Sequence, residues 1–228
     1  GSYAEYCVRP ANRVIPVADS LDSTAAATLF VAYGTAFRAL FQRGGASPGE
    51  TLLVHGASGG VGLAAVQLAR WRGLRVLATA GTDVGRALVV AQGAEQVFDH
   101  HDPGHAEAIR AATDGSGVDL ILEMLANANL ETDLPLLSRG GRVMVVGSRG
   151  SVEITPRALM RVEADIRGVM LYGASEPEFV QMQAGIAEAI ADGAVSPVVQ
   201  RTLPLDQAAE AQRLVMEEPS LGRIVLTM

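Results

Sequence analysis

The chain has 228 residues, of which 49% are hydrophobic, and it carries a formal net charge of −7. This acidic balance argues against a nucleic-acid partner, and no apolar stretch is long enough to span a bilayer. All 18 basic residues are arginine, which excludes P-loop, Schiff-base and short-chain-reductase sites that need a lysine. The single cysteine, Cys7, excludes an internal disulfide and a cysteine-cluster zinc site. With no secretory signal at the start, we expect a cytoplasmic protein.

The first 50 residues are mixed in character. Residues 3–8 are predicted to form a strand, and residues 13–17 a short extended piece. Residues 24–43 are predicted to form a helix, because apolar residues such as Leu29, Ala32 and Ala36 fall on one face. A turn rich in glycine and proline then separates this helix from the next element.

From residue 51 onward, apolar strand-like runs alternate with helical segments. This rhythm predicts a doubly wound α/β domain, a parallel Rossmann sheet with helices on both faces. Strands are expected at residues 51–55, 75–79, 96–99, 118–123, 142–147 and 166–172, and helices at 60–72, 84–92, 106–112, 129–137 and 157–162. An amphipathic helix at 177–193, a strand at 198–203, a helix at 205–217 and a strand at 223–226 complete the chain.

The most informative segment is the glycine-rich turn after the first strand of this domain. Residues 57–62 read ASGGVG, which fits the dinucleotide fingerprint G-x-G-x-x-G with alanine in the first glycine place. Small residues let the backbone turn sharply and approach a pyrophosphate, while amides at the helix start face the phosphates. The predicted binding residues here are Ser58, Gly59, Gly60, Val61 and Gly62. Ser58 is expected to donate to a phosphate, to cap the helix, or both.

Several blocks of sequence resemble one family. They are LVHGASGGVGLAA at 53–65, ATAGT at 78–82, EMLANANL at 123–130 and GGRVMVVGSRGSVEITPR at 140–157. Together they resemble the zeta-crystallin type of quinone oxidoreductase, in the zinc-independent branch of the medium-chain dehydrogenase/reductase superfamily. Members begin with a GroES-like catalytic domain. The resemblance therefore implies a remnant of that domain at residues 1–30, a Rossmann NADPH-binding domain at 31–175, and a segment at 176–228 that returns to the catalytic domain.

The resemblance implies NADPH as the cofactor, and the residues give separate support. NAD-specific sites usually place an acid at the tip of the second strand, but this strand ends in Ala-Thr-Ala-Gly-Thr. Gly81 and Thr82 lie in this turn, and Arg86 is placed to pair with a 2′-phosphate. Asp83 would repel a phosphate, so the preference for NADPH over NADH rests on the absent acid.

Other candidate cofactor residues follow the later strands, whose carboxyl ends line the cleft in such folds. Thr35 resembles a family threonine near the nicotinamide, although a helix-facing structural threonine is nearly as good an interpretation. Arg223 resembles a basic residue that reaches the cofactor in relatives, and a solvated surface arginine is the alternative. The remaining candidates are Asn127, Gly147, Ser148, Arg149 and Tyr172.

The histidines invite a metal interpretation, which we do not favour. His101 and His105 are four residues apart and have acids beside them, but Asp102-Pro103 is typical of an ordinary helix start. His55 is expected to be structural. Glu123 is predicted to anchor a loop through hydrogen bonds, with a general-base role as the alternative.

The resemblance implies NADPH-dependent reduction of a quinone or similar activated carbonyl, by cofactor chemistry and positioning. No catalytic side chain is predicted. Two alternatives stay open: an enoyl reductase of a polyketide-type synthase, and a catalytically incomplete NADPH-binding or dimerising fragment. A homodimer or homotetramer with a small-molecule substrate is expected.

Overall fold

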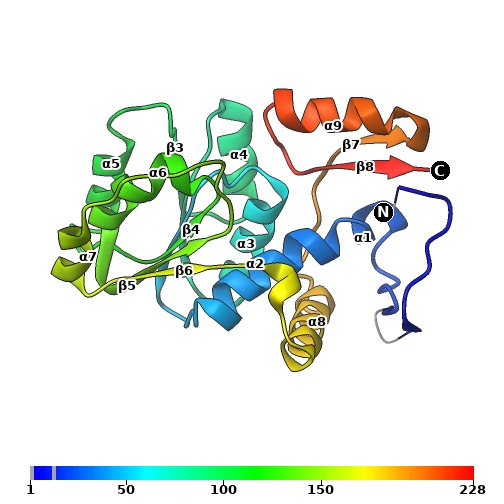
Figure 1. Cartoon of the computed structure of the whole chain (residues 1–228), viewed down its shortest axis with the longest axis horizontal. Helices are drawn as coiled ribbons and strands as arrows, with labels where there is room; N and C mark the ends of the chain where they lie inside the picture. Colours follow the sequence, from blue (N-terminus) through cyan, green and yellow to red (C-terminus); the bar gives the residue numbers. More distant parts are fainter. Residues whose placement is uncertain (1–2, 12–13) are drawn as a thin grey trace.

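A six-stranded parallel sheet with the order β3-β2-β1-β4-β5-β6 forms the middle layer of the larger part of the molecule, on the left of Figure 1. The computed structural model describes residues 3–11 and 14–228. This strand order reverses direction between β1 and β4, which confirms the predicted doubly wound fold. The strands are β1 Thr51–Val54, β2 Arg75–Thr79, β3 Gln96–Phe98, β4 Val118–Glu123, β5 Leu137–Val145 and β6 Asp165–Gly168.

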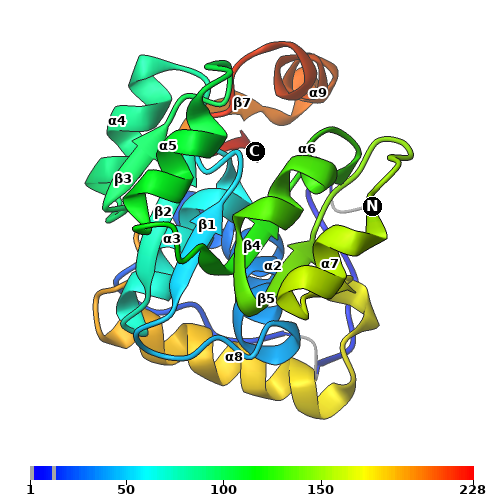
Figure 2. The same ribbon diagram turned by 90° about the vertical axis from the view of Figure 1, so that its left-hand side faces the viewer.

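Helices cover both faces of the sheet (Figure 2). Successive side chains of each strand point to opposite faces, so both faces carry apolar residues that the helices bury. Leu52 and Val54 of β1 join one core, and Leu53 joins the other. Burial on both sides explains the nearly continuous apolar sequence of the central strands. The first core includes α3 (Gly60–Trp71), α4 (Asp83–Ala91) and α8 (Glu176–Ala191), and the second includes α5 (His105–Ala112), α6 (Ala126–Asp133) and α7 (Pro156–Val162).

The helix predicted at residues 24–43 is present as nearly continuous helical segments, α1 (Ser23–Ala26), η2 (Leu29–Tyr33), α2 (Gly34–Phe37) and η3 (Arg38–Arg43). Two of these, η2 and η3, have the wider turns of a π-helix. Ala32, Ala36 and Leu40 are buried, as the predicted face requires. The amphipathic α8 buries Phe179 and Met182 near α2. Over the described residues, no helix combines the length and apolarity needed to cross a membrane.

The C-terminal segment forms a two-stranded parallel unit at one end of the molecule (Figure 1). It consists of β7 (Val199–Pro204), η6 (Leu205–Gln207), α9 (Ala208–Glu217) and β8 (Arg223–Thr227). The amide of Gly222 donates to the carbonyl of Ser58 at 2.9 Å, and Gly222 also bridges to Gly59. This contact ties the end of the chain to the glycine-rich turn.

The strand predicted at residues 3–8 is wrong. The side chains of Tyr3, Tyr6 and Val8 are 60%, 89% and 92% exposed. No strand in the described part of the chain pairs with this segment, so its backbone has no ladder to join. Residues 14–17 are likewise outside any strand, and Arg13 lies outside the described residues.

Several element boundaries also differ from the prediction, among them the following two. Strand β6 ends at Gly168, and a 3₁₀ turn, η5 (Leu171–Gly173), takes the place of the strand end expected at residue 172. Helix α6 begins at Ala126 and passes through η4 (Leu134–Leu136) into β5, so Leu137 is a strand residue paired with Val118. A buried apolar residue next to a turn suits either element, which is why periodicity misplaced both ends.

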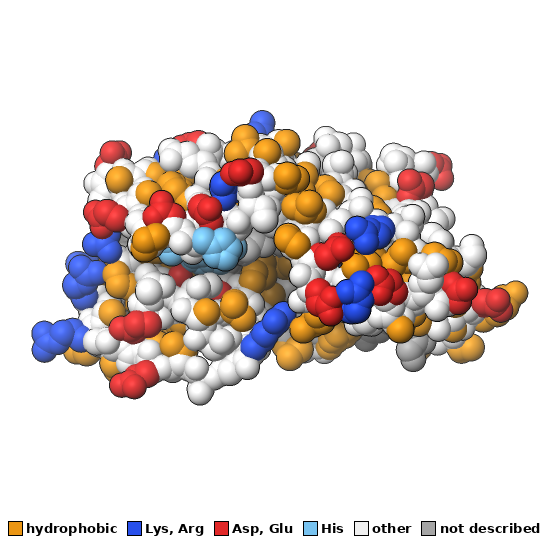
Figure 3. Space-filling model, turned by 90° about the horizontal axis from the view of Figure 1, so that it is seen from above, with side chains coloured by type: hydrophobic (Ala, Val, Ile, Leu, Met, Phe, Trp, Pro, Cys, Tyr) orange, Lys and Arg blue, Asp and Glu red, His pale blue; other side chains and the backbone are white. Residues whose placement is uncertain are grey.

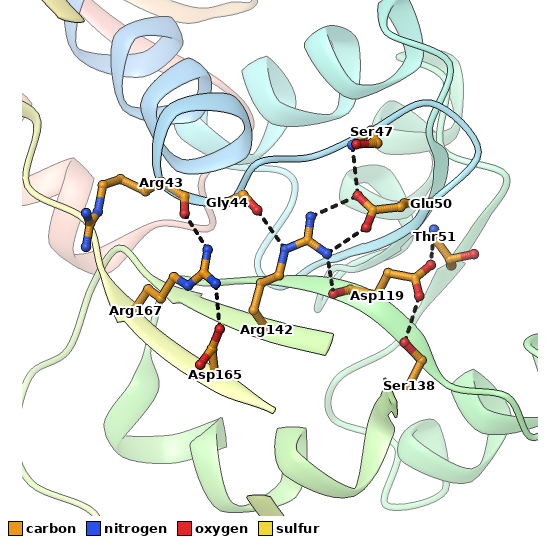
Figure 4. A network of polar contacts seen from close by, with 10 residues as sticks. All are labelled: Arg43, Gly44, Ser47, Glu50, Thr51, Asp119, Ser138, Arg142, Asp165 and Arg167. Carbon is orange, nitrogen blue, oxygen red and sulfur yellow. Dashed lines mark hydrogen bonds and ion pairs between the residues drawn. The ribbon is translucent and has the colours of Figure 1, made fainter. Parts of the chain in front are cut away.

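Charged groups at the amino edge of the sheet are closely paired (Figure 4). The buried guanidinium of Arg142 donates to both carboxylate oxygens of Glu50, at 2.7 and 2.8 Å, and to the carbonyls of Gly44 and Asp119. Hydrogen bonding to Arg142, the largest cause, lowers the pKa of Glu50. The Asp119 carboxylate accepts from the Thr51 amide. This network joins the starts of β1, β4 and β5.

Candidate functional site

At two positions of the glycine-rich turn, Gly60 and Gly62, an added side chain would collide with neighbouring atoms. A Cβ added to Gly62 would lie 2.6 Å from the Ala57 Cα, and one added to Gly60 would lie 2.2 Å from the Arg223 Cδ. The φ of Gly56 is +57°, in the left-handed region that favours glycine. Because α3 begins at Gly60, its first-turn amides have no acceptor within the helix and face outward with the positive end of the helix dipole.

Ser58 does not cap α3, so that part of the prediction is wrong. The residue before α3 is Gly59, and no side chain bonds the first turn. The Ser58 side chain instead lies beside the start of α4, where its Cβ is 3.3 Å from the position of a Cβ on Gly85. The cap of α4 is Thr82, whose Oγ1 accepts from the Gly85 amide at 3.0 Å.

The turn after β2 meets a pair of histidines from the loop after β3. A Cβ on Gly81 would lie 2.5 Å from Nε2 of His100 and 2.7 Å from Nε2 of His101. The two imidazole rings stand edge to face, 4.5 Å apart between centroids. Burial, the largest cause, lowers the pKa of His100. Histidine side chains lie at the rim of a hollow on this face of the molecule (Figure 3).

Arg86 lies on α4 beside the same turn and is held by two carboxylates. Its guanidinium pairs with Asp83 one turn earlier and with Asp99 Oδ2 at 2.9 Å. It also donates to the carbonyl of Ala80 at 3.4 Å. The positive charge of Arg86 is therefore already paired. Among the described residues, no carboxylate forms a hydrogen bond with the imidazole of His100 or His101.

The loop after β5 is anchored on Asn127. Its side-chain oxygen accepts from the Arg149 amide at 2.7 Å and from the Ser148 hydroxyl at 3.4 Å. The carbonyl of Gly147 accepts from the Ala126 amide at 2.9 Å. These four predicted residues therefore come together, and the side chains of Ser148 and Arg149 are exposed.

Two predicted site residues, Thr35 and Tyr172, have no contact with the glycine-rich turn or the 147–150 loop among those given above. Thr35 is buried on α2, which packs against α3 and α8. Tyr172 is 76% exposed and lies 6.2 Å from Phe30 between ring centroids. It lines an apolar cavity of about 790 Å³, together with Phe30, Phe179 and Met182. No residue of the glycine-rich turn lines this cavity.

A buried cluster of three ionisable residues lies behind the turn. His55 Nε2 is 2.9 Å from Asp133 Oδ1 and 3.9 Å from Glu123 Oε2. Nδ1 of His55 lies 3.2 Å from the hydroxyl of Thr79, which accepts from the Gly56 amide. Glu123 accepts from the Leu125 amide and from the Asn129 side chain, which confirms the predicted loop anchor.

The ionisation of this cluster is perturbed in one consistent direction. Burial first, and then the charge of Asp133, raise the pKa of Glu123 to about 7. Burial alone would lower the pKa of His55, but the neighbouring carboxylates of Asp133 and Glu123 outweigh it and the pKa is raised. Although Asp133 is close to His55, neither of its oxygens has a well-directed hydrogen bond in the described structure. The cluster therefore favours the protonated forms of Glu123 and His55.

The helix start predicted at Asp102 is also wrong. Asp102 instead turns the chain three residues before α5, which begins at His105, and its carboxylate accepts from the Gly104 amide at 2.8 Å. The ring of His105 lies 2.7 Å from the Asp102 carbonyl, whereas that of His101 packs on His100. The two histidines considered as ligands thus have different neighbours.

Sequence reasoning missed His100, Asp133 and Ser220. His100 had a usable signal, because it follows the third strand and parallel strands end at one edge of the sheet. Asp133 had none, since its approach to His55 depends on how α6 packs. Ser220 lies over the glycine-rich turn, 3.5 Å from the position of a Cβ on Gly59, because the C-terminal unit docks there.

Comparison with known proteins gives a consistent family. A family model described as "Zinc-binding dehydrogenase" matches residues 60–187. Quinone oxidoreductase of Rattus norvegicus is 46% identical over 230 residues, and that of Homo sapiens 42% over 229 residues. Each match covers 100% of this chain and 70% of the relative. A mycobacterial protein solved in complex with NADPH superimposes with a TM-score of 0.92 at 28% identity, covering 100% of this chain and 72% of that one.

The family description names zinc, but this chain has no group of cysteines that could bind it. Cys7 is exposed, and it is the only cysteine. In the described part of the chain, the one close group of three possible ligands is His55, Glu123 and Asp133, whose atoms are buried and already contact one another or the loop. These three residues are engaged with one another and with the loop, and the exposed Cys7 is not among them, so they do not form a zinc site of the usual kind. With the strand order, the glycine-rich turn and these relatives in agreement, the chain belongs to the quinone oxidoreductase family of medium-chain dehydrogenases and reductases.

Proposed function

We propose that this chain binds NADPH along the carboxyl edge of its sheet and serves in the reduction of a quinone or a similar activated carbonyl. The observation that carries the proposal is the turn at residues 56–62, where backbone amides stand at a helix start and where a Cβ on Gly60 or Gly62 would collide with neighbouring atoms. Such a cradle fits a pyrophosphate, which needs donors and close backbone approach. The NADPH complex of the mycobacterial relative supports the choice of nucleotide.

In this proposal the pyrophosphate is held by the amides of Gly60, Val61 and Gly62, with the Ser58 hydroxyl beside them. Gly59 lines the same turn, and its own amide donates to the Gly56 carbonyl at 3.2 Å. Arg223 lies directly over Gly60, and no ion pair engages its guanidinium within the described structure. An unpaired arginine at a helix N-terminus adds a charge of the right sign for a phosphate.

The 2′-phosphate end is assigned to the turn at Gly81 and Thr82, with Arg86 at its side. No acid stands at the tip of β2, so nothing there selects the unphosphorylated ribose hydroxyls of NADH. Because Asp83 and Asp99 hold Arg86, we assign His100 and His101 to this end as further donors. NADPH is therefore preferred to NADH.

The nicotinamide end is assigned to Asn127, Gly147, Ser148 and Arg149. When bound, NADPH supplies the reducing equivalents, and the chain itself needs only to hold and orient the reactants. Asn127 fixes the 147–150 loop through two hydrogen bonds, which sets where a nicotinamide can lie. Thr35 on α2 is assigned to the nicotinamide by resemblance alone. Tyr172 keeps its predicted assignment to the cofactor, although the apolar cavity that it lines contains no residue of the 147–149 loop.

The larger organisation follows the family and is likewise proposed. Residues 1–30 and 176–228 belong to a catalytic domain, and residues 31–175 form the nucleotide-binding domain. We propose that the whole protein is cytoplasmic, zinc-independent and a homodimer or homotetramer.

The test is a fluorescence titration of the purified chain with NADPH and NADH, followed by assays with 1,4-benzoquinone and with an enoyl thioester. We expect NADPH to bind more tightly than NADH. Turnover of the quinone alone supports the proposal, turnover of the enoyl thioester alone points to an enoyl reductase, and binding without turnover points to a nucleotide-binding fragment.

A pair of glycine variants makes the titration specific. Gly60→Ala places a methyl group against the Arg223 side chain and is expected to weaken NADPH binding roughly tenfold. Gly168→Ala is the matched control, because a Cβ there meets nothing within 4 Å. Equal affinity in the two variants, or no binding by the unaltered chain, would contradict the proposal.

A further inference from the structure

The buried cluster of His55, Glu123 and Asp133 lies where the loops of the proposed cleft converge. His55 is the last residue before the glycine-rich turn, and its amide donates to the Leu122 carbonyl at 3.1 Å, which ties β1 to β4. Glu123 ends β4, and Asp133 ends α6. All three side chains are buried, and their ligand atoms lie within 4.8 Å of one another.

Hydrogen bonds connect the cluster to the glycine-rich turn and to the 124–127 loop. Through Thr79, His55 is linked to the Gly56 amide. Glu123 Oε1 binds the Leu125 amide and, at 3.1 Å, the Asn129 side chain. The segment 124–127 that Glu123 holds carries Met124, whose Cβ lies 4.0 Å from the position of a Cβ on Gly56. It also carries Asn127, which anchors the 147–150 loop.

Charge counting gives the cluster two distinct states. With His55 protonated, Asp133 ionised and Glu123 protonated, the net charge is zero, and burial tolerates it. Loss of the Glu123 proton leaves two buried carboxylates against one imidazolium, and the carboxylates repel each other. Since Glu123 and Asp133 lie at the two ends of the 124–133 segment, that repulsion acts to spread it.

We propose that Glu123 is a positioning residue for the bound dinucleotide, holding the 124–127 loop against the glycine-rich turn, and that loss of one proton from the His55–Glu123–Asp133 cluster loosens the cleft. This inference rests on the proposed function, since it concerns the same cleft. Three side chains face Glu123. They are His55, which directly follows β1, and Asn129 and Asp133, which lie on α6. The next titratable group is His100, which is electrostatically coupled to His55.

The direction of the pKa shifts sets the pH range. Burial and Asp133 bring the pKa of Glu123 to about 7, so the loosened state gains population as pH rises through neutrality. The ionisable groups of NADPH itself also contribute to the affinity, so the affinity of one protein against pH is ambiguous. The ratio of two affinities, wild type over variant, cancels those shared contributions.

The experiment measures the NADPH dissociation constant from pH 5.5 to 8.5 for the wild type and for Glu123→Gln, by nicotinamide fluorescence. Glutamine keeps an oxygen for the Leu125 amide but cannot lose a proton. We expect the ratio of wild-type to variant Kd to rise about tenfold as pH passes through neutrality, corresponding to about 1.4 kcal/mol. Glu131→Gln, on the same helix with its oxygens on Thr155, is the matched control and should follow the wild type.

A ratio that does not change with pH overturns the inference while the proposed function stands, whereas absence of NADPH binding at every pH overturns both. If Glu123→Gln does not fold, Asp133→Asn serves instead, because it removes the carboxylate that raises the pKa of Glu123. That variant should also lose the pH dependence, and a wild-type pH profile in it would overturn the inference.

Discussion

The two edges of the central sheet treat buried charge in opposite ways. At the amino edge, Arg142 is matched by the carboxylate of Glu50 and by two carbonyls (Figure 4). At the carboxyl edge, Asp133 has no well-directed hydrogen bond, and Glu123 faces a second acid. The first edge is satisfied internally, while the second keeps amides and ionisable groups that a ligand or a proton can satisfy. We therefore assign stability to one end of these strands and the proposed binding to the other.

Removing Arg142 should break the amino edge with the largest effect. Arg142→Ala leaves Glu50 without its partner and two carbonyls without a donor, so we expect a loss of about 3 kcal/mol in the free energy of unfolding. Urea unfolding measures it. The folded variant should bind NADPH as the wild type does, and a large loss of affinity with little loss of stability would contradict the division between the edges.

Titrating the carboxyl edge should have the next largest effect. The pKa of Glu123 is raised from 4.5 to about 7, so the folded chain binds more protons than the unfolded chain between these values. Stability therefore falls as pH rises from about 5 to about 7.5, by about 2 kcal/mol. The raised pKa of His55 acts in the same sense, since its contribution is present at low pH and lost on deprotonation.

Urea unfolding of the nucleotide-free chain at several pH values measures this slope. In Glu123→Gln it should be smaller, because one of the two groups no longer titrates. A wild-type stability that rises between pH 5 and 7.5, or an unchanged slope in the variant, would refute the assignment.

Removing Arg223 tests the phosphate cradle. Arg223→Ala leaves β8 intact but takes away the charge over Gly60, and we expect NADPH affinity to fall about tenfold, or about 1.4 kcal/mol. Arg213→Ala is the control, because Arg213 pairs with Glu210 and Glu217 on the exposed side of α9. Equal affinities in these two variants would show that Arg223 is only a surface arginine.

The smallest effect is expected from an exposed pair at the amino side. Arg139 and Glu163 are 3.0 Å apart, with side chains 80% and 66% exposed. Solvent screens such pairs, so Arg139→Ala should change the free energy of unfolding by less than about 0.5 kcal/mol. A loss comparable to that of Arg142→Ala would mean that burial is not what separates the two arginines.

Sequence alone predicted the doubly wound parallel sheet and the approximate place of each strand, because βαβ units follow strict packing rules and central strands are apolar runs. It failed where an element depends on a distant partner. Residues 3–8 have strand composition but no strand beside them, and Ser58 lies next to α4, so it does not cap α3. The turn residues were predictable from steric need, whereas the His55–Asp133 contact was not, since it forms only when α6 packs on the sheet beside β4 and β5.

The most direct test of the account is a map of backbone amide shifts in ¹H–¹⁵N spectra on addition of NADPH. We expect the largest changes at Gly59–Gly62, Gly81 and Ser148, at the carboxyl edge, and little change at Gly44, Asp119 and Arg142. Changes concentrated at the amino edge, or confined to the apolar cavity beside Tyr172, would contradict it.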